Sequence, residues 1–177
     1  MQFNNKALDN AKLTKLLILD VDGVLTDGGL YFDDNGAEFK RFNALDGHGI
    51  KMLRNSGVEV AIISARKSKC VAHRMKGLGI EHYYQGQSDK YIAYSQLLEK
   101  LNLTGDQVAY VGDDVIDLPV MSKVSLPIAV SNAHDFVKKH AIATTEKHGG
   151  HGAVREVCDA LLQAQNCYDA LMNTYLQ

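Results

Sequence analysis

The sequence predicts an α/β protein built on a doubly wound, Rossmann-like parallel sheet. Short apolar runs alternate along the chain with longer segments whose apolar residues recur at helical spacing. Runs with little polar alternation are typical of parallel strands that are buried on both faces. The chain has 177 residues and shows no internal repeat or linker. We therefore expect residues 1–177 to form a single domain.

The order of the expected elements follows from this alternation. Strands are expected at residues 16–19, 58–63, 108–111 and 128–130, with a weaker candidate at 141–143. Helices are expected at residues 49–55, 67–76, 90–101, 116–121, 135–140 and about 153–165, the last being the most regular. Gly57 and Gly77 follow two of these helices, where a left-handed C-terminal cap favours a residue without a Cβ atom.

One segment, residues 29–42, departs from the α/β rhythm. Apolar residues alternate on both sides of Asn35-Gly36, and this dipeptide favours a β-hairpin because both turn positions adopt a positive φ. An isolated two-stranded hairpin is marginally stable in water, so its aromatic residues need a surface that covers them. These residues are Tyr31, Phe32, Phe39 and Phe42.

Composition excludes several classes of protein. The chain is 46% hydrophobic and 23% charged, as in globular proteins, and its formal net charge is -2. It lacks the basic excess that nucleic-acid binding needs, any apolar run of about 18 residues, and a recognisable signal peptide. We expect a cytoplasmic protein without nucleic-acid or membrane partners. Its three cysteines are too few and too unevenly spaced for a disulfide framework or a metal site.

Two clusters of aspartates follow expected strands. Asp20 and Asp22 come directly after residues 16–19, and Asp113, Asp114 and Asp117 follow residues 108–111. If these strands are neighbours, the clusters converge at one edge of the sheet, where ligand sites form in such folds. Several converging carboxylates need a counter-charge, and all-oxygen ligands favour Mg²⁺ over zinc. The alternative is that the aspartates cap helices or form turns, an interpretation that stays open above all for Asp117.

Two further residues fit a site for an anion. Ser64 follows the expected strand at residues 58–63, and Lys90 stands at the start of an expected helix. A hydroxyl and an ammonium group there would complete an oxyanion pocket. Taken alone, Ser64 would be a helix cap and Lys90 a solvated surface charge.

The order of these motifs resembles the haloacid dehalogenase superfamily of aspartate-nucleophile phosphatases over nearly the whole chain. The resembling motifs are Asp20-Val-Asp22-Gly, the strand-end Ser64, Lys90 and Gly112-Asp113-Asp114-Val-Ile-Asp117. The resemblance implies that Asp20 is the nucleophile and Asp22 the general acid and base. It implies that Asp20, Asp113 and the Asp22 backbone carbonyl bind Mg²⁺, supported by Asp114 and Asp117, while Ser64 and Lys90 hold the phosphoryl oxygens.

Members of this superfamily often carry an inserted cap domain, for which this chain has no room. Capless members admit bulky substrates or borrow a lid from another subunit. The aromatic hairpin favours the second option, and we expect a homo-oligomer, a tetramer with hairpins packed around its axis. The tail after Asn166 is a candidate to cover a neighbouring site.

Within the capless branch, the chain is most similar to the family that hydrolyses 3-deoxy-D-manno-octulosonate 8-phosphate, an acidic sugar phosphate, during lipopolysaccharide synthesis. The resemblance places residues 43–47 and Lys51 around the sugar, with Arg66 and Arg74 facing its carboxylate or phosphate. For Lys51 and Arg74 a solvated helix face is the alternative. The expected substrate-binding set comprises Asp22, Asn43, Ala44, Leu45, Asp46, Gly47, Lys51, Arg66, Arg74 and Lys90.

Other functions remain open at this point. One is a phosphatase for another acidic sugar phosphate, such as a sialic-acid-type 9-phosphate. Another is a non-enzymatic phospho-receiver domain, although receivers usually place the phosphoacceptor on a middle strand. An inactive scaffold is disfavoured because every motif residue is present. His148 and His151 could suggest a metal site, but a glycine-rich loop before a helix is the simpler interpretation.

Overall fold

The computed structural model describes residues 1 and 3–176 and confirms the predicted fold class. A parallel six-stranded sheet has the order β5-β4-β1-β6-β7-β8. Its strands are β1 (Leu16–Leu19), β4 (Glu59–Ile63), β5 (His82–Tyr84), β6 (Val108–Gly112), β7 (Leu126–Ala129) and β8 (Ala143–Thr144). The two central strands, β1 and β6, are buried at every position, as expected for parallel strands covered on both faces.

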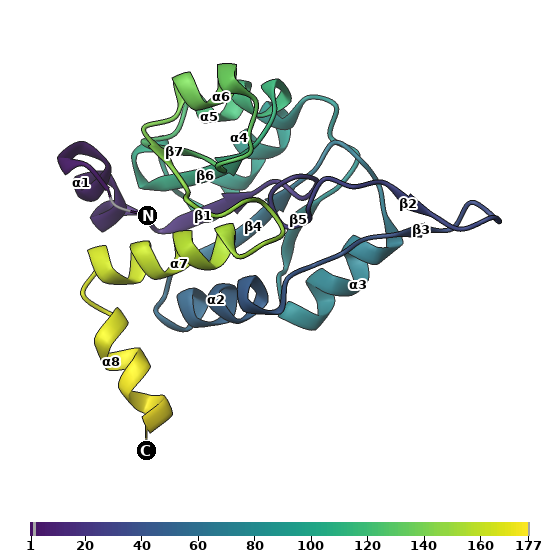
Figure 1. Cartoon of the computed structure of the whole chain (residues 1–177). Coiled ribbons are helices and arrows are strands. Elements are labelled where there is room, and N and C mark those ends of the chain that lie inside the picture. The colour runs from purple at the N-terminus through teal and green to yellow at the C-terminus, as the bar shows by residue number, and fades with distance from the viewer. Residues whose placement is uncertain (2, 177) are drawn as a thin grey trace.

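Helices cover both faces of the sheet. In Figure 1, α2 (Ala44–Asn55), α3 (Lys69–Leu78) and α7 (Ala153–Ala164) lie on one side, and α4 (Lys90–Leu101), α5 (Leu118–Met121) and α6 (Asp135–His140) lie on the other. Two further helices, α1 (Asn5–Leu13) and α8 (Tyr168–Asn173), were not predicted. Strand β5 was also missed, since its three residues carry no apolar run.

Helices α4 and α6 match their predicted bounds, whereas α2, α3, α5 and α7 each differ from the prediction at one end or both. Helix α2 begins at Ala44 rather than Gly49 because the Asn43 side chain caps it, accepting a hydrogen bond from the Leu45 N–H. Gly57 follows α2 at φ 95°, as expected, but Gly77 lies inside α3 and the left-handed cap is Gly79, at φ 69°. The Gly77 prediction was therefore wrong by two residues.

The hairpin forms, although its turn is of another type. Strands β2 (Tyr31–Phe32) and β3 (Glu38–Phe39) pair antiparallel. Among the described residues of the turn only Gly36 has a positive φ, 79°, so the expected turn with positive φ at both Asn35 and Gly36 is wrong. Asp33 organises a longer loop instead, because its carboxylate accepts hydrogen bonds from the N–H groups of Asn35 and Ala37.

The hairpin extends away from the rest of the fold (Figure 1). Its aromatic side chains Tyr31, Phe32 and Phe39 are about half exposed, at 45%, 57% and 56%. In the part of the chain that the structure describes, no helix is long and apolar enough to cross a membrane.

Candidate active site

The two acidic clusters converge because β1 and β6 are neighbours in the sheet. Leu19 pairs with Val111, so the chain leaves both strands at the same edge, and the N–H of Asp20 donates to the Val111 carbonyl at 3.1 Å. Asp20, Asp113 and Asp117 each offer a carboxylate oxygen, and these oxygens lie within 4.8 Å of one another. The convergence expected from the sequence is therefore present.

A buried lysine lies between these carboxylates. The Lys90 ammonium is 2.9 Å from Asp20 Oδ1 and 2.6 Å from Asp117 Oδ1, and its side chain is only 1% exposed. Lys90 reaches this position because it is the first residue of α4, which Asp89 caps. Burial alone would lower the pKa of Lys90, but the charges of Asp20 and Asp117 outweigh it and raise that pKa. Lys90 is not a solvated surface charge.

The Asp117 carboxylate accepts hydrogen bonds from the groups around it and fixes their positions. Its Oδ1 accepts hydrogen bonds from Lys90 and from the hydroxyl of Tyr110, both at 2.6 Å. Its Oδ2 accepts from the N–H groups of Asp113 and Asp114 at 3.0 and 3.3 Å. With both oxygens occupied by donors, Asp117 is suited to fix the loop and the lysine rather than to bind an ion directly.

The remaining carboxylates carry more negative charge than their surroundings neutralise. Burial and the charge of Asp117 raise the pKa of Asp20 to about 7, against the opposing effect of Lys90. Burial, followed by the charges of Asp20 and Asp117, raises the pKa of Asp113 to about 8. The Oδ1 atom of Asp113 is buried and has no hydrogen-bond partner. An oxygen-rich, unpartnered site of this kind fits a divalent cation.

A tight turn at Gly23 packs the segment after β1, which holds Asp20 and Asp22, against Asp113. Gly23 has φ 90°, and a Cβ atom at this position would lie 2.0 Å from Asp113 Oδ2. The hydroxyl of Thr26 secures the turn by accepting hydrogen bonds from the N–H groups of Gly23 and Gly28. The glycine that follows Asp22 is therefore needed both for its backbone conformation and for the space that it leaves.

A cavity of about 150 Å³ opens beside these groups. Its lining residues are Asp20, Asp22, Ser64, Ala65, Arg66, Asp113, Asp114 and Ile116. Ser64 does not cap a helix, since α3 begins at Lys69; its hydroxyl oxygen accepts from the Arg66 N–H at 3.3 Å. Asp114 caps a short helical turn by accepting from the Val115 N–H, so the capping interpretation holds for that residue.

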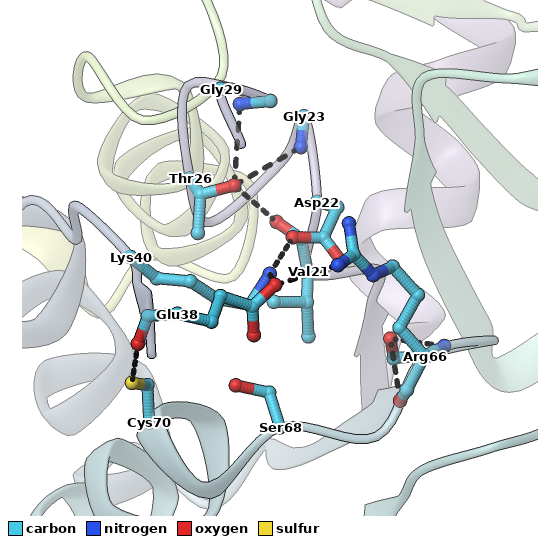
Figure 2. A network of polar contacts seen from close by, with 12 residues as sticks. Val21, Asp22, Gly23, Thr26, Gly29, Glu38, Lys40, Arg66, Ser68 and Cys70 are labelled. Atoms are coloured by element: carbon cyan, nitrogen blue, oxygen red, sulfur yellow. Dashed lines mark hydrogen bonds and ion pairs between the residues drawn. The ribbon is translucent and has the colours of Figure 1, made fainter. Parts of the chain in front are cut away.

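The carboxylate of Asp22 is held from the hairpin by a residue that the sequence did not single out. Lys40 donates to Asp22 Oδ1 at 2.5 Å and pairs with Glu38 Oε1 at 3.3 Å. The same Glu38 oxygen accepts from Arg66 at 2.6 Å. Figure 2 shows these side chains pointing toward one another beside the turn that holds Thr26. Lysine in an alternating strand pattern gave no sign of this role.

The residues expected around a sugar lie mostly away from the cavity. Among the described residues, none of Asn43–Gly47, Lys51 or Arg74 lines it. Asp46 is 1% exposed and accepts from the Arg155 N–H in the first turn of α7. Arg74 donates to the Asn43 carbonyl and stacks over Phe42, 5.9 Å from the ring centroid. The contacts of Asp46 and Arg74 therefore hold the start of α2 in place. Leu45 and Lys51 are exposed.

The glycine-rich segment around His148 and His151 packs against the turn that follows β1. Gly150 donates its N–H to the Val24 carbonyl at 2.9 Å, and a Cβ atom on Gly149 would lie 1.7 Å from the Gly23 oxygen. His151 contacts Arg41 at 3.0 Å. Among the residues described, neither histidine belongs to a cluster that could hold a metal ion. The structure therefore supports the packing interpretation.

Comparison with known proteins places this site in a family. The model of haloacid dehalogenase-like hydrolases matches residues 82–157. The 3-deoxy-D-manno-octulosonate 8-phosphate phosphatase KdsC of Salmonella typhi is 55% identical over 162 residues, which cover 92% of this chain and 86% of that protein.

Solved structures agree with the sequence relatives. The 3-deoxy-D-manno-octulosonate 8-phosphate phosphatase of Yersinia pestis is 48% identical, with a TM-score of 0.92 over 93% of this chain and 89% of that one. The Moraxella catarrhalis enzyme, solved in complex with magnesium, phosphate and KDO, is 42% identical, with a TM-score of 0.94 over 97% and 98% of the two chains. The chain therefore belongs to the haloacid dehalogenase-like hydrolases, in the KdsC family of phosphatases, whose chemistry depends on a divalent metal ion.

Proposed function

We propose that the chain hydrolyses 3-deoxy-D-manno-octulosonate 8-phosphate to the free sugar acid and phosphate. The observation that carries this proposal is the convergence of Asp20, Asp113 and Lys90 at the carboxyl ends of two neighbouring strands. Relatives of 55% identity that bear this activity support it. We extend it to the whole of residues 1–177 as one phosphatase domain.

Asp20 is the proposed nucleophile. A carboxylate oxygen of Asp20 attacks phosphorus, and the bond between phosphorus and the sugar oxygen breaks, leaving an aspartyl-phosphate. A carboxylate needs no activating base, unlike a serine hydroxyl. Lys90, at 2.9 Å from Asp20, compensates negative charge on the phosphoryl oxygens, and Ser64, which lines the cavity beside Asp20, donates its hydroxyl.

Asp22 is the proposed general acid and base. It protonates the sugar oxygen as the phosphorus–oxygen bond breaks, and the resulting carboxylate then accepts a proton from water. The water oxygen attacks phosphorus and releases phosphate, which regenerates Asp20. Asp22 is suited to both steps because it lines the cavity and its side chain is 23% exposed.

The proposed cofactor is Mg²⁺. Asp20 and Asp113 would hold it through carboxylates and Asp22 through its backbone carbonyl, with Asp114 and Asp117 in support. The buried, unpartnered Oδ1 of Asp113 favours this assignment, and oxygen donors without histidine or cysteine match the preference of Mg²⁺. When bound, the ion neutralises charge on the phosphoryl group.

The size of the cavity bears on the substrate. About 150 Å³ is well below the 300–1,000 Å³ of typical ligand pockets. It suits a phosphoryl group, so the sugar would extend over the rim, where Arg66 offers a cation to its carboxylate. We propose that residues 43–47, Lys51 and Arg74 shape that outer region rather than the phosphoryl pocket.

A comparison of specificity constants tests the substrate. With Mg²⁺ present, we expect kcat/KM for 3-deoxy-D-manno-octulosonate 8-phosphate to exceed that for a sialic-acid-type 9-phosphate. A reversed order would assign the chain to the second substrate. A long-lived phosphoprotein without release of phosphate would instead indicate a phospho-receiver and overturn the proposal.

We further propose a cytoplasmic homotetramer assembled through the hairpin. The exposed aromatic side chains of β2 and β3 support this, since they need a covering surface. Sedimentation of a compact monomer at micromolar concentration would contradict it. The tail after Asn166 runs away from the hairpin in Figure 1, so any covering role would fall on a neighbouring subunit. Full activity after deletion of residues 167–177 would argue against that role.

A further inference from the structure

The hairpin places a buried cation against the proposed acid and base. Lys40 Nζ lies 2.5 Å from Asp22 Oδ1, and the Lys40 side chain is 1% exposed although its backbone lies at the base of a solvent-exposed hairpin. A buried ammonium is costly unless it is paired. Lys40 is paired with two carboxylates, those of Asp22 and Glu38, so its position is held from both sides.

The alternation of the strand explains why Lys40 points inward. Successive side chains of an extended chain face opposite sides, so Glu38 and Lys40 share one face while Phe39 and Arg41 share the other. The exposed fractions agree: the side chains of Glu38 and Lys40 are 17% and 1% exposed, whereas the Arg41 side chain is 54% exposed and Phe39 is 56% exposed. The residues that contact the site are thus fixed by the register of the hairpin.

Charge in this network is balanced among four residues. When Asp22 is ionised, Lys40 and Arg66 contribute two positive charges, and Asp22 and Glu38 two negative ones. When Asp22 carries the proton for the sugar oxygen, the Lys40 ammonium still donates a hydrogen bond to it, and its role is to hold the carboxyl group in place. Glu38 links the two cations, since its Oε1 contacts both Lys40 and Arg66 (Figure 2). The Glu38 carbonyl also accepts from the Cys70 thiol at 3.2 Å, which ties the hairpin to α3. The network therefore joins the hairpin, the turn after β1 that holds Asp22, and the segment after β4 that holds Arg66.

We propose that Lys40 is a positioning residue that orients the Asp22 carboxylate for proton transfer to the leaving group, and that Glu38 sets the place of Lys40. This inference rests on the proposed function, because it assumes that Asp22 protonates the sugar oxygen. It makes the hairpin part of the catalytic arrangement. A rearrangement of the hairpin base would then alter leaving-group protonation without touching Asp20 or Lys90.

Two substrates with different leaving groups test this role in Lys40→Met, which keeps an unbranched side chain of similar length and removes the charge. A sugar alkoxide needs protonation to leave, whereas p-nitrophenolate leaves with little help. For Lys40→Met we expect kcat/KM for the sugar phosphate to fall roughly tenfold to a hundredfold, while kcat/KM for p-nitrophenyl phosphate stays near the wild-type value. Since kcat/KM reports steps up to phosphoryl transfer, hydrolysis of the intermediate does not affect the comparison.

Further variants isolate the effect. In an Asp22→Asn background, Lys40→Met is expected to add no further loss for the sugar phosphate, since the group that it orients is gone. Lys40→Arg should recover part of the rate. Lys12→Met is the matched control, because that lysine is 53% exposed on α1, which precedes β1, whereas the site follows β1, and both substrates should be turned over as by the wild type.

The proposal is overturned if Lys40→Met slows both substrates equally, slows neither, or raises KM for the sugar phosphate with kcat unchanged. The last result would make Lys40 a substrate-binding residue. Turnover by the wild type is measured first and tests the proposed function separately. If the wild type hydrolyses another alkyl phosphate instead of 3-deoxy-D-manno-octulosonate 8-phosphate, kcat/KM for that compound is compared with kcat/KM for p-nitrophenyl phosphate in the same variants.

Discussion

The ammonium of Lys90 lies 2.9 Å from the carboxylate of Asp20, in a site where both side chains are almost fully buried. Their contact joins the first residue of α4 to the end of β1. Burial leaves Asp20 with a raised pKa of about 7 in spite of this cation, because Asp117 adds a second negative charge nearby. Lys90 therefore supplies one positive charge among several carboxylates, and a metal ion would supply the remaining positive charge that they need.

Removal of the Lys90 charge is expected to cost both activity and stability. In Lys90→Met, Asp20 and Asp117 lose their shared cation, and breaking a buried ion pair typically costs about 3–5 kcal/mol. We expect kcat to fall on the order of a hundredfold to a thousandfold, as when a preorganised charge that stabilises the transition state is removed. Steady-state kinetics and denaturant unfolding measure the two effects. The exposed Lys100 on the same helix gives the control Lys100→Met, and equal behaviour of the two variants would contradict the assignment.

The close approach of Gly23 to Asp113 predicts a loss of activity in Gly23→Ala. The added Cβ atom would lie 2.0 Å from Asp113 Oδ2, so the carboxylate or the turn must move. A displacement of about 1 Å at a catalytic group can cost about a hundredfold in rate. Gly57→Ala is the control, because Gly57 also has a positive φ, 95°, but no atom lies within 4 Å of its Cβ position. Both variants carry a backbone strain of about 1–2 kcal/mol.

Only Gly23→Ala is expected to lose turnover and to need more Mg²⁺ for half-maximal activity. Unchanged activity of Gly23→Ala, at a stability equal to that of Gly57→Ala, would show that the tight packing against Asp113 has no functional consequence.

The raised pKa values of Asp20 and Asp113, about 7 and about 8, predict a pH dependence of the metal-free protein. A carboxyl group whose pKa is higher in the folded state binds more protons when folded. Its contribution to stability is complete below about pH 4 and is lost as the pH rises through 7 and 8. We expect the melting temperature of the metal-free protein to fall between about pH 4 and about pH 8, and Mg²⁺ to reduce this fall.

Asp113→Asn provides the matched comparison, since it removes one of the two titrating groups and keeps the shape of the side chain. Its melting temperature in the absence of metal should depend less on pH than that of the wild type. Parallel curves for the two proteins would contradict the shifted pKa of Asp113.

The helix that contains Gly77 offers a prediction of stability alone. Gly77 lies inside α3, and no atom lies within 4 Å of its Cβ position. Glycine in a helix interior is about 0.5–1 kcal/mol less stable than alanine. Gly77→Ala is therefore expected to raise the free energy of unfolding by about that amount with kcat unchanged. Destabilisation would indicate a contact that the structure does not contain.

The sequence indicated the strands that carry the site because their burial leaves an unmistakable pattern. The strand before Asp20 matched its predicted bounds, and the one before Asp113 differed by one residue. Convergence of the two clusters also followed from a simple rule about parallel strands. By contrast, β5 has no apolar run to reveal it, and only the fold shows that it pairs with β4.

Local signals failed where tertiary contacts decide the outcome. Gly77 and Gly79 are both plausible caps, and the choice depends on where packing ends the helix. Asn35-Gly36 favours a two-residue turn, but the Asp33 carboxylate binds two N–H groups of the loop and lengthens it. Lys40 was overlooked because nothing in an alternating strand distinguishes a lysine that points to solvent from one that points into a site.

The most direct test of the central claim is the rate at which phosphate is released by Asp20→Asn from 3-deoxy-D-manno-octulosonate 8-phosphate, with Mg²⁺ present. The amide is close in shape to the carboxylate but cannot form the aspartyl-phosphate, so we expect a folded protein with the wild-type circular dichroism spectrum and no measurable turnover. Appreciable phosphatase activity in this variant would remove Asp20 from the role of nucleophile and contradict the account.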